Sequence, residues 1–205
     1  IILRYFNVSG ADENSRSGLL TNPDNLFKAI CEVAVKKRDK FVVNGKNYKT
    51  KDGTTIRDFI HVSDLAEMHI LAAETIINEN ITEIFNCGYG EGYSVKDVID
   101  ETNKILGENI NVEFGPQREG DAVHTVANNK KFVEKFNWKP KYNNLNYIIK
   151  TALNLPLNTN MSPAPAPIIG NRSISIDKSF IPPAPPTAVI GTFTEDLSNS
   201  ISSIS

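Results

Sequence analysis

The feature that most constrains the fold of this chain is the alternation of extended and helical patterns along residues 1–154. Short runs rich in Val, Ile and Phe predict strands. We place these strands at residues 1–6, 41–43, 57–62, 83–87 and 110–114. Apolar residues at helical spacing predict helices between and after the strands, at residues 22–38, 64–77, 94–106, 128–136 and 144–153. Strands that alternate with helices are typical of an α/β fold.

Local signals mark the ends of these helices. Asn22 followed by Pro23 is typical of an N-cap and a first helical position. Ser94 and Asp97 have the spacing of a capping box. The basic residues 36–38 favour a helix end, where the helix dipole stabilises cations.

The helix expected at residues 64–77 has apolar residues on most of its sides. They are Leu65, Met68, Ile70, Leu71, Ala72 and Ile76. Such a pattern predicts that the helix is largely buried, with His69 at the edge of the core.

Residues 155–205 differ in composition from residues 1–154. They hold eight of the eleven prolines, many Ser, Asn and Thr residues, and only five charged residues. Such a segment buries too little apolar surface to offset the entropy lost on ordering. We therefore predict two regions, a folded domain at 1–154 and a disordered Pro/Ser-rich tail at 155–205. The alternative for the tail is a proline-rich docking segment for a protein partner.

Charge and hydropathy exclude several classes of protein. The formal net charge is −2, which leaves no basic field for a phosphate backbone, so no nucleic-acid partner is expected. No apolar run approaches the ~18–20 residues of a membrane span, and no secretory leader opens the chain. Cys31 and Cys87 are too few for a disulfide framework and indicate reduced thiols. We therefore expect a cytoplasmic protein without a membrane partner.

Three polar clusters could carry chemistry: residues 4–7 at a strand end, Arg57 with Asp58, and residues 118–121. Polar groups beyond the carboxyl ends of strands are where open α/β sheets bind ligands. Two arginines, each beside a carboxylate, suit a bidentate grip on phosphate in which the acid orients the guanidinium. The alternative is two ordinary surface ion pairs, which contribute little.

The glycines at 88, 90 and 92 resemble a dinucleotide-binding loop between a strand and a helix. The third glycine is misplaced for that motif, and no acidic residue ends a strand ~20 residues further on. A tight βα turn is the favoured interpretation. The three histidines and two cysteines lack metal-ligand spacing, so no zinc site is expected. No G-x-S-x-G elbow is present, which argues against a serine hydrolase.

Five motifs follow one another in the chain, at residues 3–11, 52–54, 57–66, 85–88 and 118–121. In this order they resemble the C-terminal half of UDP-glucose 4-epimerases, which are extended short-chain dehydrogenases/reductases of the NAD-dependent epimerase/dehydratase family. The resemblance covers about residues 1–154. It implies the sugar-nucleotide-binding part of an extended Rossmann epimerase.

The resemblance also implies a reaction, the interconversion of UDP-glucose and UDP-galactose in galactose metabolism. In the family, NAD takes a hydride from C4 of the hexose and returns it to the other face. The family's G-x-x-G-x-x-G loop and Tyr-x-x-x-Lys pair are both absent from these 205 residues. We therefore assign no catalytic residue, and expect an inactive chain that binds UDP-glucose or UDP-galactose but not NAD by itself.

Three alternatives stay open. A separate N-terminal half could supply the NAD site and the base, so that an active epimerase assembles from two chains. The chain could instead be a non-enzymatic UDP-sugar-binding or docking module. Dehydratases and decarboxylases share much of this half, so a neighbouring substrate is the third alternative.

By resemblance, ten residues bind the substrate: Asn7, Asn25, Leu26, Val42, Val43, Asn44, Arg57, Arg118, Asp121 and Thr125. Arg57 and Arg118 hold the diphosphate, and Asp121 accepts from a ribose hydroxyl. Asn7 contacts the sugar nucleotide. Tyr5 and Phe6 border the nicotinamide and are the only residues assigned to the cofactor.

The remaining roles follow from the same resemblance. Asn25 and Leu26 lie in the first turn of a helix, where free N–H groups attract the diphosphate. Residues 42–44 line the uracil. Thr125 flanks the hexose where some relatives have a tyrosine, and its small side chain leaves room for UDP-N-acetylhexosamines.

The resemblance finally places the strands at 3–6 and 83–87 in the NAD-binding sheet. Parallel strands of that kind are normally covered on both faces. In this chain we expect their apolar residues to be exposed, namely Ile2, Leu3, Tyr5, Ile84 and Phe85.

Overall fold

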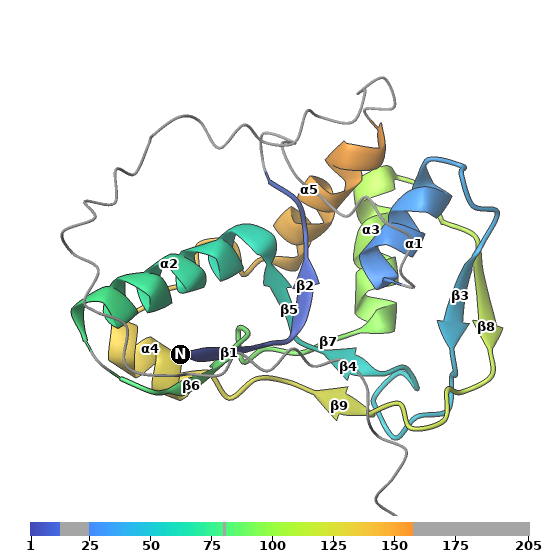
Figure 1. The fold of residues 1–205 in the computed structure, drawn as a ribbon. Helices are drawn as coiled ribbons and strands as arrows, with labels where there is room; N and C mark the ends of the chain where they lie inside the picture. Colours follow the sequence, from blue (N-terminus) through green and yellow to red (C-terminus); the bar gives the residue numbers. More distant parts are fainter. Residues whose placement is uncertain (13–24, 80, 158–205) are drawn as a thin grey trace, which may run out of the picture. The chain divides into compact units, whose positions relative to one another are not determined.

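A computed structural model of the chain describes residues 1–12, 25–79 and 81–157, without the side chains of 154–157 (Figure 1). The strands are β1 (Ile2–Tyr5), β2 (Asn7–Ser9), β3 (Phe41–Asn44), β4 (Ile56–Arg57), β5 (Phe59–His61), β6 (Ile84–Cys87), β7 (Tyr93–Ser94), β8 (Val112–Gly115) and β9 (His124–Thr125). The helices are α1 (Leu26–Ala34), α2 (Val62–Asn78), α3 (Val95–Leu106), α4 (Lys130–Phe136) and α5 (Leu145–Leu157). The alternation confirms the predicted α/β class.

Most strand pairs in the described part of the chain are parallel. β1 pairs with β6, β2 with β5, and β3 with β8, each in parallel register. β4 lies between β7, which is antiparallel to it, and β9, which is parallel. The short strands β2, β7 and β9 were not predicted, because two or three extended residues carry no periodic signal.

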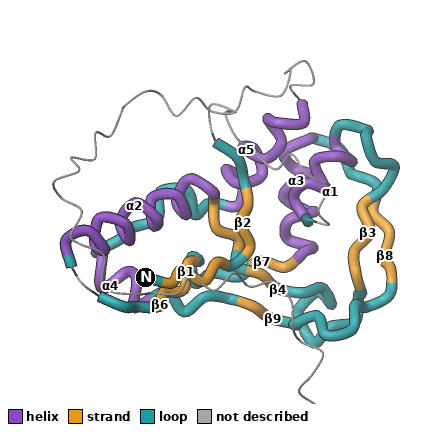
Figure 2. The backbone as a smooth tube through the Cα atoms, viewed as in Figure 1, coloured by secondary structure: helices purple, strands orange, loops and turns teal. Residues whose placement is uncertain are grey.

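The helices and strands form two apolar cores. One core joins α1, α3 and α5 to β3 and β5. The other lies among α2, α4, β5 and β6. Figure 2 shows the same division, with α1, α3 and α5 grouped together and α2 beside α4. The predicted tail begins inside α5, which continues to Leu157, and the rest of it lies outside the described residues.

Helix α1 begins later than predicted. Asn25 is its N-cap, and the Asn25 side chain accepts from the backbone N–H groups of Phe27 (3.0 Å) and Lys28 (3.3 Å). The predicted cap, Asn22, lies outside the described residues together with Pro23. The helix ends at Ala34, so residues 36–38 follow it and do not close it.

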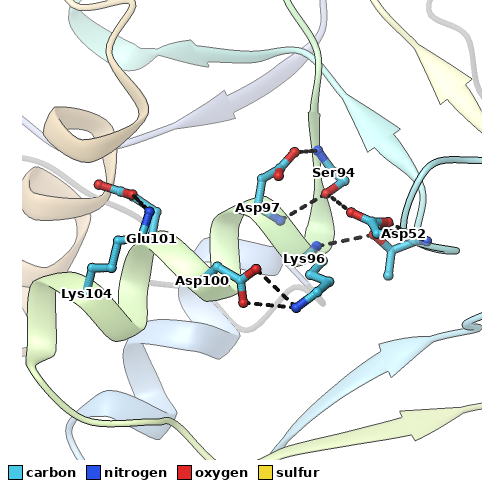
Figure 3. A network of polar contacts seen from close by, with 8 residues as sticks. Asp52, Ser94, Lys96, Asp97, Asp100, Glu101 and Lys104 are labelled. Atoms are coloured by element: carbon cyan, nitrogen blue, oxygen red, sulfur yellow. Dashed lines mark hydrogen bonds and ion pairs between the residues drawn. The ribbon is translucent and has the colours of Figure 1, made fainter.

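The start of α3 is fixed by a polar network (Figure 3). The predicted capping box is confirmed: the Asp97 N–H donates to Ser94 Oγ (2.9 Å), and the Ser94 N–H donates to Asp97 Oδ2 (2.8 Å). Ser94 Oγ donates to Asp52, which also accepts from the N–H (2.8 Å) and the hydroxyl (2.7 Å) of Thr54. The Thr54 hydroxyl accepts from the Lys96 N–H (3.2 Å). The loop before β4 is thereby tied to the helix that follows β7.

The apolar residues of β1 and β6 are only partly exposed. Ile2, Tyr5 and Ile84 are 54%, 53% and 46% exposed, as expected. The expectation for Phe85 was wrong, because α4 covers it. Its ring makes edge contacts with Phe132 and Phe136, at centroid distances of 5.5 and 5.3 Å. Leu3 is half-buried against the same core.

Helix α2 is buried on one side only, which corrects the prediction of a largely buried helix. Leu65, Met68 and Ala72 face the core, whereas Ile70 and Ile77 are 58% and 82% exposed. Ile76 and His69 are exposed too. No helix in the described ranges is long and apolar enough to cross a membrane.

Candidate functional site

A cleft of about 390 Å³ opens among α1, β2, β3, β4 and the segment after β8. Its lining residues are Asn7, Val8, Asn25, Leu26, Phe27, Ala29, Arg38, Phe41, Val42, Val43, Asn44, Thr55, Arg57, Phe59, Val95, Arg118 and Asp121. Apolar side chains of α1 and β3 therefore share one hollow with three arginines. A mixed lining of this kind suits a ligand that has an apolar ring and an anionic group.

The cleft brings together nine of the ten residues predicted to bind the substrate. Thr125 is the exception, since it is not among the lining residues. It lies beside the cleft nevertheless, because β4 and β9 pair with Arg57 opposite Thr125. Paired residues of neighbouring strands point to the same face of a sheet, so Thr125 lies on the Arg57 side. The individual roles assigned to these residues stay predictions.

The fold explains why such distant residues meet. Asn7 follows the carboxyl end of β1, and its N–H donates to the Asp58 carbonyl (3.0 Å), which places it beside β4. The parallel pair of β3 and β8 places Asn44 opposite Gly115, three residues before Arg118. Three segments that lie far apart in the sequence thus end at one cleft, at the carboxyl ends of strands.

Arg57 is held by two hydrogen bonds. Its Nη1 donates to the Ile56 carbonyl (2.8 Å) and its Nη2 to Oδ1 of Asp121 (2.5 Å). The side chains of Arg57 and Asp121 are only 14% and 28% exposed. The acid that orients Arg57 therefore comes from residues 118–121 and not from the neighbouring Asp58.

Asp58 points away from the cleft, which corrects the prediction that it orients Arg57. It is fully buried, and its carboxylate accepts from the backbone N–H groups of Tyr89 (2.9 Å), Gly90 (2.8 Å) and Ala127 (3.1 Å). Burial raises the pKa of Asp58, although these hydrogen bonds lower it in part. Asp58 thus joins the segment that follows β6 to the segment that follows β9.

Residues 118–121 form a turn that carries two of the polar groups in the cleft. The Asp121 N–H donates to the Arg118 carbonyl (3.3 Å), and Gly120 has a φ of +74°. A positive φ at the third position of a turn favours glycine. At the start of the turn, the Asn44 side-chain amide faces the Arg118 guanidinium. With the amide oxygen assigned to that side, as the donors of Arg118 require, Asn44 accepts from Nε (3.0 Å) and Nη2 (3.2 Å). Asn44 and Arg57 therefore hold the two ends of the turn.

The first turn of α1 differs from the prediction. Asn25 and Leu26 line the cleft, but the Asn25 side chain already accepts from the N–H groups of Phe27 and Lys28. Two of the donors expected to attract a diphosphate are therefore engaged within the helix cap. The arginines are left as the main anion-binding groups of the site.

Arg38 is a lining residue that sequence reasoning missed. Its Nε (3.1 Å) and Nη2 (3.0 Å) donate to Glu32, six residues earlier in the last part of α1. We interpreted Arg38 as part of a helix end, because three consecutive basic residues are typical there. Because α1 ends earlier, Arg38 reaches the cleft. Phe41 at the start of β3 was recognised only as a strand residue, although it also lines the site.

Tyr5 and Phe6, the residues assigned to the cofactor, lie outside this cleft. The Tyr5 hydroxyl is 2.6 Å from His69 Nε2, and His69 Nδ1 is 2.8 Å from the Leu65 carbonyl. Because a carbonyl can only accept, Nδ1 carries the proton and Nε2 accepts from Tyr5. The Phe6 N–H donates to the Cys87 carbonyl (3.2 Å), at the end of the pair formed by β1 and β6.

The glycine-rich segment that the structure describes does not fit the phosphates of NAD. In the glycine-rich segment at 88–92, the N–H groups of Tyr89 and Gly90 already donate to Asp58. A Cβ at Gly88 would lie 2.6 Å from the Ala127 Cβ and 2.7 Å from Asp58 Oδ2. The glycine therefore permits close packing within the protein. The segment is a tight turn between β6 and β7, as the favoured interpretation predicted.

Other reactive groups lie apart from the site. Burial, with a smaller contribution from Glu32, raises the pKa of Cys31 to about 12, and burial raises that of Cys87 to about 11. Both thiols are therefore protonated at neutral pH and are weak nucleophiles. Among residues 1–12, 25–79 and 81–157, no group of three or more His, Cys, Asp or Glu side chains could hold a metal ion.

Comparisons with known proteins agree with this geometry. Residues 1–88 match the profile of the NAD dependent epimerase/dehydratase family. A UDP-glucose 4-epimerase of Azospirillum brasilense is 40% identical over 154 residues, which are 75% of this chain and 44% of that protein. The chain thus spans less than half of the length of the curated relatives it matches.

Solved structures show the same relationship. A UDP-glucose-4-epimerase of Stenotrophomonas maltophila, with bound NAD and formylated UDP-arabinopyranose, matches with a TM-score of 0.73 at 30% identity, over 77% of this chain and 47% of that one. The UDP-Glc/GlcNAc 4-epimerase of Campylobacter jejuni matches with a TM-score of 0.62 at 40% identity, over 76% and 47%.

The fold and the cleft define the class: this is a Rossmann-like α/β protein of the epimerase type. More particularly, the chain is similar to the NAD dependent epimerase/dehydratase family: that family's profile matches residues 1–88, and the Azospirillum brasilense UDP-glucose 4-epimerase aligns with 75% of the chain. The resemblance to UDP-glucose 4-epimerases that the sequence motifs predicted is confirmed.

Proposed function

We propose that the chain binds a UDP-hexose in this cleft, as the sugar-nucleotide-binding part of a UDP-glucose 4-epimerase. The observation that carries the proposal is the meeting of Arg57 and Arg118 at one cleft, although 60 residues separate them in sequence. Two guanidinium groups on one side of a hollow match the two phosphates of a nucleoside diphosphate.

In this proposal each part of the ligand has its own place in the cleft. The diphosphate lies at Arg57 and Arg118, and the uracil packs on the apolar side chains of β3. The second oxygen of Asp121 accepts from a ribose hydroxyl, since Arg57 occupies only Oδ1. The hexose extends toward Asn7 and Thr125. UDP-glucose and UDP-galactose are the proposed ligands, in the cytoplasm.

We further propose that these 205 residues do not catalyse epimerisation by themselves. The sequence contains neither a Tyr-x-x-x-Lys pair nor a G-x-x-G-x-x-G loop. Loss of a general base alone typically costs ~10²–10⁴ in rate. The glycine-rich segment at 88–92 offers no free N–H groups at Tyr89 and Gly90 for the phosphates of NAD either, because both donate to Asp58.

Calorimetric titration of the purified chain with UDP tests the binding proposal. UDP should bind to the wild type and bind at least tenfold more weakly to Arg57→Ala, a loss of ~1.4 kcal/mol or more. Arg4→Ala is the matched control, because Arg4 is an exposed arginine of β1 outside the cleft. Equal weakening by both substitutions, or no binding to the wild type, would refute the proposal.

A 4-epimerase assay with and without added NAD tests the second proposal. We expect no turnover of UDP-glucose above that of a mock purification. Turnover that persists after host epimerase has been excluded would contradict the expected inactivity.

The exposed face of α2 favours a second candidate function, one half of an epimerase assembled from two chains. Ile70 and Ile77 form an apolar strip on a helix whose other side is buried, and β1 has one described partner strand only. Strand edges and apolar strips of this kind bind further protein. Epimerase activity that appears only when an NAD-binding half is added would support this candidate over the inactive chain.

A further inference from the structure

Asn44 ends β3 with its side chain turned toward Arg118. With the amide oxygen facing the guanidinium, Asn44 accepts from Nε at 3.0 Å and from Nη2 at 3.2 Å. The donors on Arg118 determine this orientation, because an amide nitrogen there would face only other donors. One amide oxygen therefore holds two adjacent nitrogens of one guanidinium.

The two arginines of the cleft differ in how they are supported. Arg57 is largely buried and is held by a backbone carbonyl and by Asp121. Arg118 lies in an exposed turn, and its long side chain has many rotamers in water. A hydrogen-bonded neighbour on a strand reduces the number of those rotamers, and Asn44 is such a neighbour.

The backbone fixes Asn44 more firmly than it fixes Arg118. Asn44 pairs with Gly115 in the ladder of β3 and β8, and the Gly45 N–H donates to the Gly115 carbonyl (3.2 Å). A Cβ at Gly45 would lie 2.5 Å from Gln117 Cγ, so the end of β3 packs closely on the segment that leads to Arg118. Asn44 therefore stands on a hydrogen-bonded strand next to a long side chain from an exposed turn, which is an arrangement that can preorganise a binding group.

We infer that Asn44 is a positioning residue for the diphosphate: it holds the Arg118 guanidinium toward the cleft. The inference rests on the proposed binding of UDP. It also changes the role first assigned to Asn44, contact with the uracil, because the amide oxygen is engaged by Arg118. Arg118 also lines the cleft, so a guanidinium held in this way is placed beside the proposed diphosphate.

A comparison of UDP with uridine separates the two roles. Affinities are measured by calorimetry for UDP and by ligand-observed NMR for uridine, on the full chain, for the wild type, Asn44→Ala, Arg118→Ala and the double variant. Asn44→Ala should weaken UDP binding about three- to tenfold, as expected for a lost hydrogen bond to a charged group, and should leave uridine binding unchanged. The double variant should bind UDP no more weakly than Arg118→Ala alone.

Two further variants sharpen the comparison. Val42→Ala removes a neighbouring side chain from the same strand and should weaken uridine and UDP by the same factor. Arg118→Lys keeps the charge but loses the guanidinium fork, so Asn44→Ala should have less than half of its effect on that background. Circular dichroism and thermal unfolding confirm that each variant is folded.

The outcomes are distinct. If Asn44→Ala weakens UDP and uridine equally, or if its effect multiplies fully with that of Arg118→Ala, Asn44 does not position Arg118 and the inference is wrong. If the wild type binds UDP, the proposed function stands whatever the variants show. If the wild type does not bind UDP, the proposed function fails first, and the inference fails with it.

Discussion

Arg57 Nη2 lies 2.5 Å from Asp121 Oδ1, a contact that joins β4 to a turn 64 residues further along the chain. The turn is held at its other end by the contact of Asn44 with Arg118. Two side chains on two separate strands therefore position both functional groups of residues 118–121.

The planar guanidinium group of Arg57 should contribute more to UDP affinity than its positive charge alone. Lysine at this position keeps the positive charge but cannot contact the Ile56 carbonyl, Asp121 and a phosphate in fixed directions at once. We expect Arg57→Lys to weaken UDP binding about tenfold, measured by calorimetry. Arg4→Lys serves as the control and should bind UDP as the wild type does. Wild-type affinity in Arg57→Lys would show that charge alone suffices.

The Gly120→Ala variant tests whether UDP binding depends on the shape of the turn at residues 118–121. The φ of Gly120 is +74°, and no atom lies within 4 Å of an added Cβ, so alanine would strain the backbone without a steric clash. Gly107, the C-cap of α3, has a φ of +72° and equally open surroundings, but lies outside the cleft. Both Gly→Ala variants should lose about 1 kcal/mol of stability on thermal unfolding.

Only Gly120→Ala should also weaken UDP binding, because its turn carries Arg118 and Asp121. We expect a loss of at least threefold, roughly 0.7 kcal/mol, at unchanged affinity in Gly107→Ala. Equal affinities in the two variants would mean that the shape of the turn does not position these groups.

The next prediction concerns Thr125 and the UDP-hexoses that a completed enzyme accepts. Thr125 pairs with Arg57 across β4 and β9, and its side chain is small. We expect an enzyme completed with an NAD-binding half to accept UDP-N-acetylglucosamine beside UDP-glucose, because in the proposed binding mode the small Thr125 side chain leaves room on the C2 side of the sugar. The Thr125→Tyr variant should lower kcat/KM for the acetylated substrate and leave that for UDP-glucose nearly unchanged. Rejection of the acetylated substrate by the wild type would contradict the prediction.

Asp52 should make stability depend on pH. Burial alone would raise its pKa, but hydrogen bonds from Ser94 and Thr54 outweigh that effect and lower the pKa below its usual value. Because the pKa of the folded state is depressed, the stabilisation is present above the pKa of the unfolded state, ~3.9. It is lost as the pH falls through the lower pKa of the folded state.

The Asp52→Asn variant measures this contribution. Chemical unfolding at pH 7 should show a loss of about 1 kcal/mol, since Asp52 accepts three hydrogen bonds at the start of α3. The difference between variant and wild type should shrink as the pH falls below 4. Asp100→Asn, which affects only an exposed ion pair with Lys96, should change stability little. A difference that stays constant with pH would exclude this role of Asp52.

The sequence predicted the long elements well because their signals are local. The capping box of Ser94 and Asp97 depends on residues three positions apart, and α3 begins where it indicates. The start of α1 was placed too early, because Asn22 and Asn25 are both capable N-caps and only the tertiary structure selects between them. The burial of Phe85 was missed for a similar reason, since α4 covers it from almost 50 residues away.

Prediction of the candidate site was limited in the same way, because local sequence patterns do not reveal tertiary contacts. Family resemblance predicted ten substrate-binding residues, and nine of them line one cleft, because the resemblance carries information on tertiary contacts that periodicity lacks. The partners of the arginines were not found. Arg57 is followed directly by an acid, yet consecutive residues of an extended segment point to opposite sides, so Asp58 is buried while Arg57 faces the cleft. The contact of Asn44 with Arg118 depends on the register of β3 and β8, which no local pattern reveals.

The exposed side of α2 carries the last prediction, on solubility. Ile70 and Ile77 lie two turns apart on the same side of the helix and are 58% and 82% exposed. Tyr5 on β1, also exposed, contacts the same helix through His69. Each Å² of apolar surface left in water costs roughly 25 cal/mol, which a domain with a stability of ~5–15 kcal/mol tolerates poorly. We therefore expect the purified chain to be aggregation-prone, and the binding and unfolding measurements described above are made on its monomeric fraction.

Size-exclusion chromatography measures the monomeric fraction of the chain, and thermal unfolding shows whether it has one cooperative transition. Ile70→Lys with Ile77→Lys should raise the monomeric fraction, because charges on an exposed apolar face oppose association. Phe114→Lys, at a residue of β8 that is 47% exposed and belongs to another part of the fold, should have little effect. Co-expression of an epimerase NAD-binding half should rescue the wild type but not the double lysine variant, since the same face would then be covered. A wild-type monomer with one sharp unfolding transition, unchanged by that half, would show that the face needs no partner.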